Sequence, residues 1–205
     1  RGRHPLHWVI ALGIQETNLS FFKMDEGVDT GDLLLQVPFT VATDNTINDV
    51  NDKINHVAYE GTRKLCKKFH SYPSYPGEKQ NHKLANYWRK RTSHDITLDL
   101  RMPADLIIRI VHSFTLPYPG ANLIFEENII KIINAKLIST DISHKELQRI
   151  EPGRIIGVEN NTINVKVDDE IIELVCSDQI PEKLLSVKYI HPPSLYVNKY
   201  KINFD

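Results

Sequence analysis

The sequence predicts an α/β segment that is followed by a small antiparallel β-rich domain. Between residues 43 and 69, apolar side chains recur at spacings of 3, 4 and 7, the pattern of one long amphipathic helix. After Gly120 the apolar residues alternate instead, in short runs separated by Asn and Asp turns. We therefore expect one domain over residues 1–100 and a second over residues 101–205.

The first domain is expected to mix helices and strands. Pro5 suits the first turn of a short helix over residues 5–13, and residues 18–24 and 33–37 predict two strands around a polar loop. A loop or linker is expected over residues 71–86, which are rich in Tyr, Pro, Gly and Asn.

The long helix carries a capping signal at its start. Thr46 is followed three residues later by Asp49, which resembles a capping arrangement. Cys66 falls on the apolar stripe, so we interpret it as a small core residue.

The second domain is expected to open with a helix over residues 103–114 and to continue as strands. The predicted strands cover residues 122–125, 129–138, 153–158, 162–167 and 171–176. Five short strands predict a small antiparallel barrel or an open roll. Residues 191–193, His-Pro-Pro, indicate an extended segment with no chemistry of its own.

Composition narrows the function classes. The 205 residues carry 25 Lys and Arg against 26 Asp and Glu, a formal net charge of -1, which argues against a polybasic nucleic-acid binder. No apolar run approaches the roughly 18–20 residues that span a bilayer, so no membrane segment is expected. The two cysteines lie far apart in no metal-ligand spacing, which favours a reducing cytoplasm over a disulfide or zinc scaffold.

Residues 25–32 form a candidate binding loop, with three aspartates and a glutamate around two glycines. Loops at the carboxyl ends of strands in α/β sheets are where ligands bind, and glycines let a backbone approach a ligand closely. The spacing fails the EF-hand pattern, so no metal is expected. A solvated acidic turn is the alternative interpretation.

Five segments in order carry a family resemblance. They are Arg-Gly-Arg-His-Pro-Leu-His-Trp at residues 1–8, Glu-Thr at 16–17, Met-Asp-Glu-Gly-Val-Asp-Thr-Gly-Asp at 24–32, Tyr-Trp-Arg-Lys-Arg-Thr at 87–92 and Pro-Tyr-Pro-Gly-Ala at 117–121. Together they resemble the folate-dependent formyltransferases, a family that includes methionyl-tRNA formyltransferase and the sugar-nucleotide N-formyltransferases. The resemblance implies that residues 1–100 are the C-terminal part of a Rossmann-like formyltransferase domain plus a linker. Residues 101–205 then make a C-terminal domain of one helix and a small β-barrel or roll.

The resemblance also implies a reaction. In the family, an amine attacks the formyl carbon of N10-formyltetrahydrofolate, and an Asn and a protonated His stabilise the resulting oxyanion. A neighbouring carboxylate favours the imidazolium and can relay the amine proton, and the matching residue here is Asp29. The family's Asn-x-His-Pro motif lies just before the Arg-Gly with which this chain begins. We therefore expect an N-terminally truncated chain that lacks roughly 80–100 residues and is inactive as a fragment.

The same resemblance assigns binding residues. N10-formyltetrahydrofolate, as formyl donor, would contact the loop through Met24, Asp25, Glu26, Gly27 and Val28. The acceptor substrate would contact Arg1, Gly2, Arg3 and His4.

The expected acceptor is the amine of an amino-deoxy-sugar nucleotide, used for lipopolysaccharide O-antigen or a similar surface glycan. Arg-Gly-Arg-His-Pro-Leu-His-Trp at residues 1–8 is similar to sugar-modifying members, whereas methionyl-tRNA formyltransferases typically read Arg-Gly-Ala-Ala-Pro. The near-zero charge agrees, and no membrane or nucleic-acid partner is expected. A homodimer is a further possibility. A methionyl-tRNA formyltransferase and a non-catalytic remnant of the family stay as alternatives.

Other polar and aromatic residues have two interpretations each. His4 and His7 either touch substrate or are surface groups at the start of a helix, and Trp8 is interpreted as core. The run Arg89-Lys90-Arg91 either contacts phosphates or is a solvated linker face.

Overall fold

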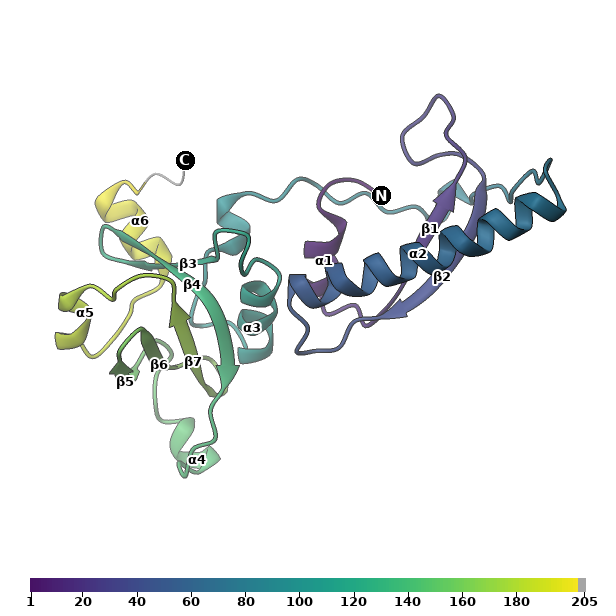
Figure 1. Cartoon of the computed structure of the whole chain (residues 1–205). Helices are drawn as coiled ribbons and strands as arrows, with labels where there is room; N and C mark the ends of the chain where they lie inside the picture. The colour runs from purple at the N-terminus through teal and green to yellow at the C-terminus, as the bar shows by residue number, and fades with distance from the viewer. Residues whose placement is uncertain (203–205) are drawn as a thin grey trace. The chain divides into compact units, whose positions relative to one another are not determined.

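The computed structural model describes residues 1–202 and confirms the mixed α/β class with a small antiparallel sheet domain. The chain divides into two compact units, Arg1–Lys90 and Arg91–Asp205 (Figure 1). Within the described residues, no helix combines the length and the apolar character needed to span a membrane.

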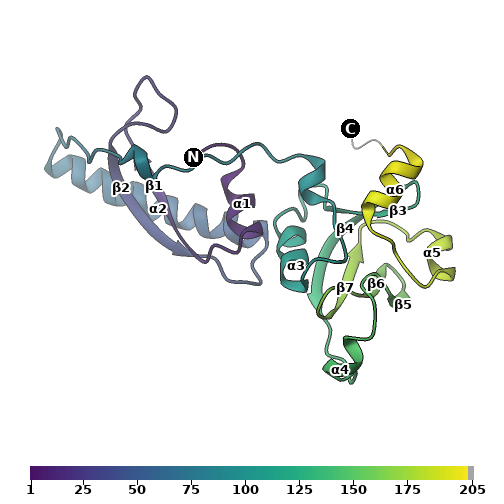
Figure 2. The same ribbon diagram turned by 180° about the vertical axis from the view of Figure 1, so that it is seen from behind.

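Unit 1 consists of one antiparallel strand pair and the helices around it. Its elements are α1 (Pro5–Ala11), β1 (Glu16–Phe22), β2 (Leu33–Thr40), α2 (Ile47–Ser71) and the 3-10 turn η1 (His82–Leu84). Glu16 pairs with Thr40 at one end of the strand pair, and the register shifts at Phe21 and Phe22 at the other. α2 packs on one face of this pair (Figure 1), and from behind the two strands lie in front of the helix (Figure 2).

The predicted start of α2 is confirmed and the prediction for Cys66 is wrong. The backbone N–H of Thr46 donates to Oδ2 of Asp49 at 2.8 Å, and that of Asp49 donates to Oγ1 of Thr46 at 3.4 Å. Two groups that the first turn leaves unpaired are thereby satisfied. Leu65 is buried but Cys66 is exposed, because the next residue along a helix points about 100° away and the buried stripe is narrow.

Unit 2 is built on a five-stranded sheet. Its helices are η2 (Ser93–Ile96), α3 (Ala104–His112), α4 (His144–Leu147), α5 (Glu182–Ser186) and α6 (Pro193–Tyr200). Its strands are β3 (Ala121–Phe125), β4 (Asn128–Leu137), β5 (Ile155–Glu159), β6 (Thr162–Lys166) and β7 (Ile171–Cys176). The order is β3-β4-β7-β6-β5 and every pair is antiparallel. β3 and β5 are the two edges, so the sheet is open and does not close into a barrel.

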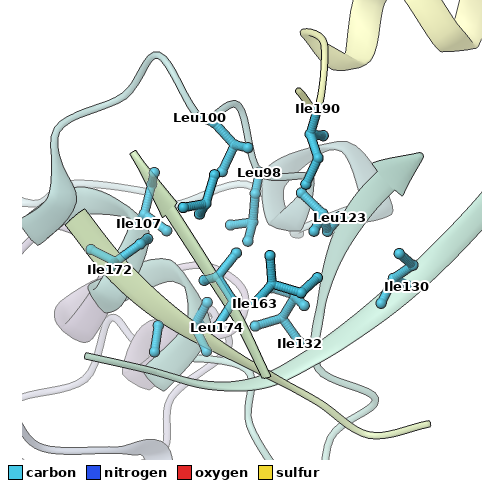
Figure 3. Packing of buried hydrophobic residues seen from close by; sticks show 14 of the residues in the cluster. Leu98, Leu100, Ile107, Leu123, Ile130, Ile132, Ile163, Ile172, Leu174 and Ile190 are labelled. Carbon is cyan, nitrogen blue, oxygen red and sulfur yellow. The ribbon is translucent and has the colours of Figure 1, made fainter. Parts of the chain in front are cut away.

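The core of unit 2 lies between this sheet, α3 and two irregular segments (Figure 3). Leu98 and Leu100 enter it from the chain before α3, and Ile190 enters it after α5 (Figure 3). Each fully buried aliphatic side chain contributes about 1.5–3 kcal/mol relative to an exposed one. The irregular segments are therefore held by the same burial that stabilises the sheet.

The predicted hairpin turns are found, whereas the segment after residue 190 differs from the prediction. Glu126 has φ 54° and Asn160 has φ 51°, the left-handed conformation that tight hairpin turns need. The interpretation of residues 191–193 as wholly extended is wrong, because Pro193 is the first residue of α6. Proline fixes φ near its helical value, so it starts a helix as readily as it ends one.

Gly153 is a position where the fold of unit 2 needs glycine. Its φ is +89°, and an added Cβ would lie 2.2 Å from the carbonyl oxygen of Ile190. We expect Gly153→Ala to lower the free energy of unfolding by about 1–3 kcal/mol, measured by urea titration.

Gly157→Ala is the matched control, since a Cβ there would meet only the Asn164 amide, at 3.9 Å, and its change is expected to stay within about 0.5 kcal/mol. Equal effects of the two substitutions would contradict the account.

Candidate functional site

The acidic loop, residues 23–32, connects β1 to β2 and is shaped from inside by one carboxylate. Oδ1 of Asp25 accepts hydrogen bonds from the Thr30 hydroxyl at 2.5 Å and from the Gly27 backbone N–H at 3.0 Å. The Thr30 hydroxyl is the main cause that lowers the pKa of Asp25, because it stabilises the charged form. Asp25 is therefore an ionised group whose first role is to close the loop on itself.

The base of the loop is closed by a backbone contact that only glycine allows. The Lys23 N–H donates to the carbonyl oxygen of Asp32 at 2.9 Å. A Cβ at Gly31 would lie 1.7 Å from the carbonyl oxygen of Lys23. The two ends of the loop thus approach each other more closely than any side-chain-bearing residue would permit.

Gln80 holds the loop from outside. Its Nε2 donates to the carbonyl oxygens of Gly31 at 2.6 Å and Asp29 at 3.1 Å. Its Oε1 accepts a hydrogen bond from Nη2 of Arg1 at 2.7 Å. One amide side chain therefore connects the first residue of the chain with the loop backbone on both sides of Thr30.

Arg1 is fixed by the segment that follows Gln80. Its Nη1 donates to the Tyr87 hydroxyl at 2.9 Å, and both terminal nitrogens lie 3.2 Å from Nδ1 of His82. Next to it, the Arg3 N–H donates to the carbonyl oxygen of Trp88 at 2.9 Å, and the Trp88 N–H donates to that of Arg1 at 3.0 Å. Residues 80–88 thus bring the start of the chain beside the acidic loop.

The structure brings some of the predicted site residues together. Asp29 is half-buried in the loop with φ 58°, a left-handed conformation that is uncommon for a non-glycine residue. Arg1 is linked to it through Gln80. Met24 and Val28 are 94% and 83% exposed. Asp25, Glu26 and Gly27, which lie between them, are also exposed.

The side chains of the remaining predicted residues lie outside this hydrogen-bond network. Gly2 and Arg3 are exposed. His4 is the residue before α1, with φ 55°, and its ring meets that of His7 edge-on at 5.8 Å. Nδ1 of His4 is buried without a hydrogen-bond partner among the described residues. The assignment of these residues to substrate stays a prediction.

Trp8 in α1 and Arg91 in the linker differ from their interpretations. Trp8 is half-buried and its Nε1 donates to the carbonyl oxygen of Arg89 at 3.0 Å, so it is only partly core. Arg91 is buried, and its Nη1 donates to the Ser113 hydroxyl at 3.0 Å within unit 2. Neither a solvated face nor a phosphate contact fits Arg91.

Gln80 and Tyr87 are the residues that the sequence analysis missed as parts of the site. Gln80 lies in a polar stretch without periodicity, and its partners are 49 and 51 residues away. Tyr87 belongs to one of the segments of the family resemblance, which gave the only signal. No group of three potential metal ligands forms within residues 1–202.

The Asp25–Thr30 bond predicts a pH effect. Thr30→Val removes the donor that stabilises the carboxylate, so the pKa of Asp25 is expected to rise toward its ordinary value of 3.8. Because the folded-state pKa is lowered, the stabilisation is present above the ordinary pKa and is lost as the pH falls through the lowered one. NMR titration of the Asp25 carboxyl carbon measures the shift.

The control for this titration is Thr62→Val, whose hydroxyl donates only to the Ala58 carbonyl within α2 and which should leave Asp25 unchanged. A titration curve for Asp25 that is the same in both variants would contradict the assignment.

The Gln80 network predicts a change in loop opening. Gln80→Leu leaves two carbonyl oxygens without their side-chain donor and removes one acceptor of the Arg1 guanidinium, at a cost of about 1–3 kcal/mol. Amide hydrogen exchange at Lys23 and Gly27 is expected to accelerate about tenfold or more, since 1.4 kcal/mol is a factor of about ten.

Gln36→Leu is the matched control, because Gln36 lies in the same unit and its Nε2 donates only to the exposed Ser20 hydroxyl. Equal exchange rates at Lys23 and Gly27 in the two variants would remove Gln80 from the site.

Comparison with known proteins shows which family the sequence matches. The family model "Formyl transferase" matches residues 1–64, and "Formyl transferase, C-terminal domain" matches residues 90–187. The methionyl-tRNA formyltransferase of Desulforamulus reducens is 30% identical over 172 residues, which cover 81% of this chain and 50% of that protein. The chain spans about half the length of the curated relatives it matches.

Solved structures share the fold. HypX from Aquifex aeolicus, in complex with tetrahydrofolic acid, matches with a TM-score of 0.68 and 15% identity over 85% of this chain and 29% of HypX. WlaRD, described as a sugar 3N-formyl transferase in the presence of dTDP and 5-N-formyl-THF, matches with a TM-score of 0.63 and 18% identity over 88% of this chain and 62% of WlaRD. At these identities the likeness concerns the fold alone. Because the two models of one family match successive parts of the chain, in the order in which its two units occur, this chain belongs to the formyl transferase family.

Proposed function

We propose that this chain is the part of an N10-formyltetrahydrofolate-dependent formyltransferase that carries the formyl-donor loop, and that the acceptor is the amine of an amino-deoxy-sugar nucleotide. The observation that carries the proposal is the Gln80 bridge, which fixes the loop backbone at Asp29 and Gly31 and joins it to Arg1. A loop that only needed to be a solvated turn would not require an outside clamp on two of its carbonyl groups.

The exposed side chains of the loop support the donor assignment. Met24 and Val28 present apolar surface to solvent from a short span of chain, and Glu26 and Gly27 between them leave their polar and backbone groups open. A flat pterin ring is partly apolar on its faces and polar at its edges, so a loop of this kind can cover both. The donor supplies an activated one-carbon group at the formyl oxidation level.

Asp29 and Asp25 would then have different roles. Asp25 is occupied with Thr30 and Gly27, so it keeps the loop in shape. Asp29 is bound to Gln80 only through its carbonyl oxygen, which leaves the carboxylate for chemistry. We assign to it the tuning of the family's histidine and the transfer of the amine proton.

The acceptor has a second candidate. The curated relatives are methionyl-tRNA formyltransferases, which favours Met-tRNA, whereas the Arg-Gly-Arg-His-Pro segment and the net charge of -1 favour a sugar nucleotide.

The test is formyl transfer from N10-formyltetrahydrofolate by the protein that the complete reading frame encodes. Turnover of dTDP-amino sugars supports the first candidate and turnover of Met-tRNA alone the second. If the formyl group is transferred to neither acceptor, the result supports the interpretation as a non-catalytic remnant of the family.

We infer the cellular location of the protein from its two cysteine thiols. Cys66 and Cys176 are both free, and burial raises the pKa of Cys176 to about 12, which makes it unreactive. A reducing cytoplasm maintains this state, and we propose it as the location.

Asp29→Asn tests the catalytic assignment in that same protein. Asn also tolerates the left-handed backbone at this position, so the substitution removes the charge and keeps the loop. We expect kcat to fall about 10²–10⁴-fold, with little change in KM for the folate donor, because the lost function is proton transfer.

Asp52→Asn, an exposed position on α2, is the control and should leave kcat unchanged. If the Asp29→Asn variant turned over at the wild-type rate, the loop would have to be interpreted as a structural turn.

A further inference from the structure

Unit 2 contains a cavity that has no part in the proposed reaction. It has a volume of about 340 Å³ and lies between α6, the segment 187–191 and the turn after β3. This is within the range of roughly 300–1,000 Å³ that small-molecule sites occupy. Most of its lining comes from residues beyond 187, where the match to the C-terminal family domain ends. The cavity is thus built largely by a segment that the family model does not describe.

The floor of the cavity is aromatic. Tyr196 is 5% exposed, and its ring meets Phe125 edge-on at 6.1 Å and stacks with Tyr200 at 6.4 Å. Its hydroxyl accepts a hydrogen bond from the His191 N–H at 3.1 Å. α6 packs against β3, where Phe125 is located, so this group of rings joins the helix to the sheet (Figure 1). The rings are fixed before any ligand arrives.

The segment 187–191 forms a second, equally anchored wall. Tyr189 accepts a hydrogen bond from Nη1 of Arg154 at 2.6 Å, and the Arg154 guanidinium lies 4.8 Å from its ring centre. The Ile190 N–H donates to the carbonyl oxygen of Gly153 at 2.8 Å, and the Ile190 side chain is buried in the core. The cavity is therefore preformed, which lowers the cost of binding.

The charge at the mouth of the cavity is positive. Lys188 and Lys199 are exposed in its lining, beside the exposed His191. The carboxylate in the lining, Glu126, is paired with Lys183 at 2.7 Å. Nζ of Lys199 lies 5.0 Å from the Tyr200 ring centre, and within residues 1–202 neither Lys188 nor Lys199 forms an ion pair. Among the described residues, two cations in the cavity lining are thus available to an anion, and one of them lies beside an aromatic ring.

We propose that this cavity binds a nucleoside monophosphate, with the base against the Tyr200 ring, which Tyr196 supports from behind, and the phosphate between Lys188 and Lys199. Bases stack on aromatic side chains whatever their sequence, and lysines are common partners of phosphate. The site is a compact, partly open cavity of about 340 Å³ and not an extended groove, which favours one nucleotide over a nucleic-acid strand. It is separate from the acidic loop, which lies in unit 1.

The experiment is isothermal titration calorimetry of the full chain with AMP and UMP, and with adenosine and inorganic phosphate as fragments. We expect at least one nucleotide to bind at least tenfold more tightly than either fragment. Lys199→Glu should weaken that binding at least tenfold, because it places a negative charge where the phosphate lies. Lys145→Glu, an equal charge change at an exposed position on α4 outside the cavity, should leave it unchanged.

Three results would overturn the proposal. The first is no binding of either nucleotide at millimolar concentration. The second is adenosine or phosphate binding as tightly as the nucleotide. The third is an equal loss in the two lysine variants. A short single-stranded RNA that binds at least a hundredfold more tightly than both mononucleotides would also overturn it, in favour of a nucleic-acid surface. Lys199 is exposed, so its substitution should not unfold the protein, and circular dichroism of both variants checks this.

Discussion

The hydrogen bonds of one amide side chain organise unit 1. Gln80 donates to two carbonyl groups of the acidic loop and accepts from Arg1, so it joins two segments that are far from it and from each other along the chain. Carbonyl groups that are withdrawn from water need such partners, because an unpaired buried acceptor costs free energy comparable to the bond itself. The position of the start of the chain and the conformation of the loop at Asp29 are therefore set by the same residue.

The residues that fix the conformation of the loop are different from the carboxylate to which we assign the chemistry. Asp25, Thr30 and Gly27 bind one another, and Gly31 lets the loop ends meet. The charged group of Asp29 is not needed for any of these contacts, although its backbone is held in a left-handed conformation. Strained, over-determined backbone beside an unused carboxylate is more typical of a functional loop than of a plain turn. The loop thus supports a role for Asp29 on local physical grounds, apart from the family to which the chain belongs.

Local patterns were predicted well from the sequence and long-range side-chain contacts were not. The Thr46–Asp49 capping box and the turns at Glu126 and Asn160 depend on residues within a few positions of each other, so their signals are local. Cys66 was misplaced because an apolar stripe does not show how wide its buried part is. Gln80 leaves no periodic pattern, since its partners are about fifty residues away. The two carbonyl groups that Gln80 binds belong to the backbone, and because every residue has such a group, the sequence carries no signal for them.

The segment after residue 187 illustrates the same limit in unit 2 and explains why its cavity went unseen. His191 and the two prolines after it give a sequence signal for irregular chain, yet Pro193 starts α6 and thereby positions Tyr196 and Tyr200 four residues apart on one helix face. The Tyr196 ring then meets Phe125 from β3, a contact between residues about seventy positions apart. Aromatic rings that are brought together in this way are usually closed off by further apolar side chains, as in a core. Here the residues next to them include Lys188 and Lys199, two exposed cations without an ion-pair partner within residues 1–202. Positive charge at the open side of a fixed aromatic cluster is explained more simply by an anionic aromatic ligand than by packing alone.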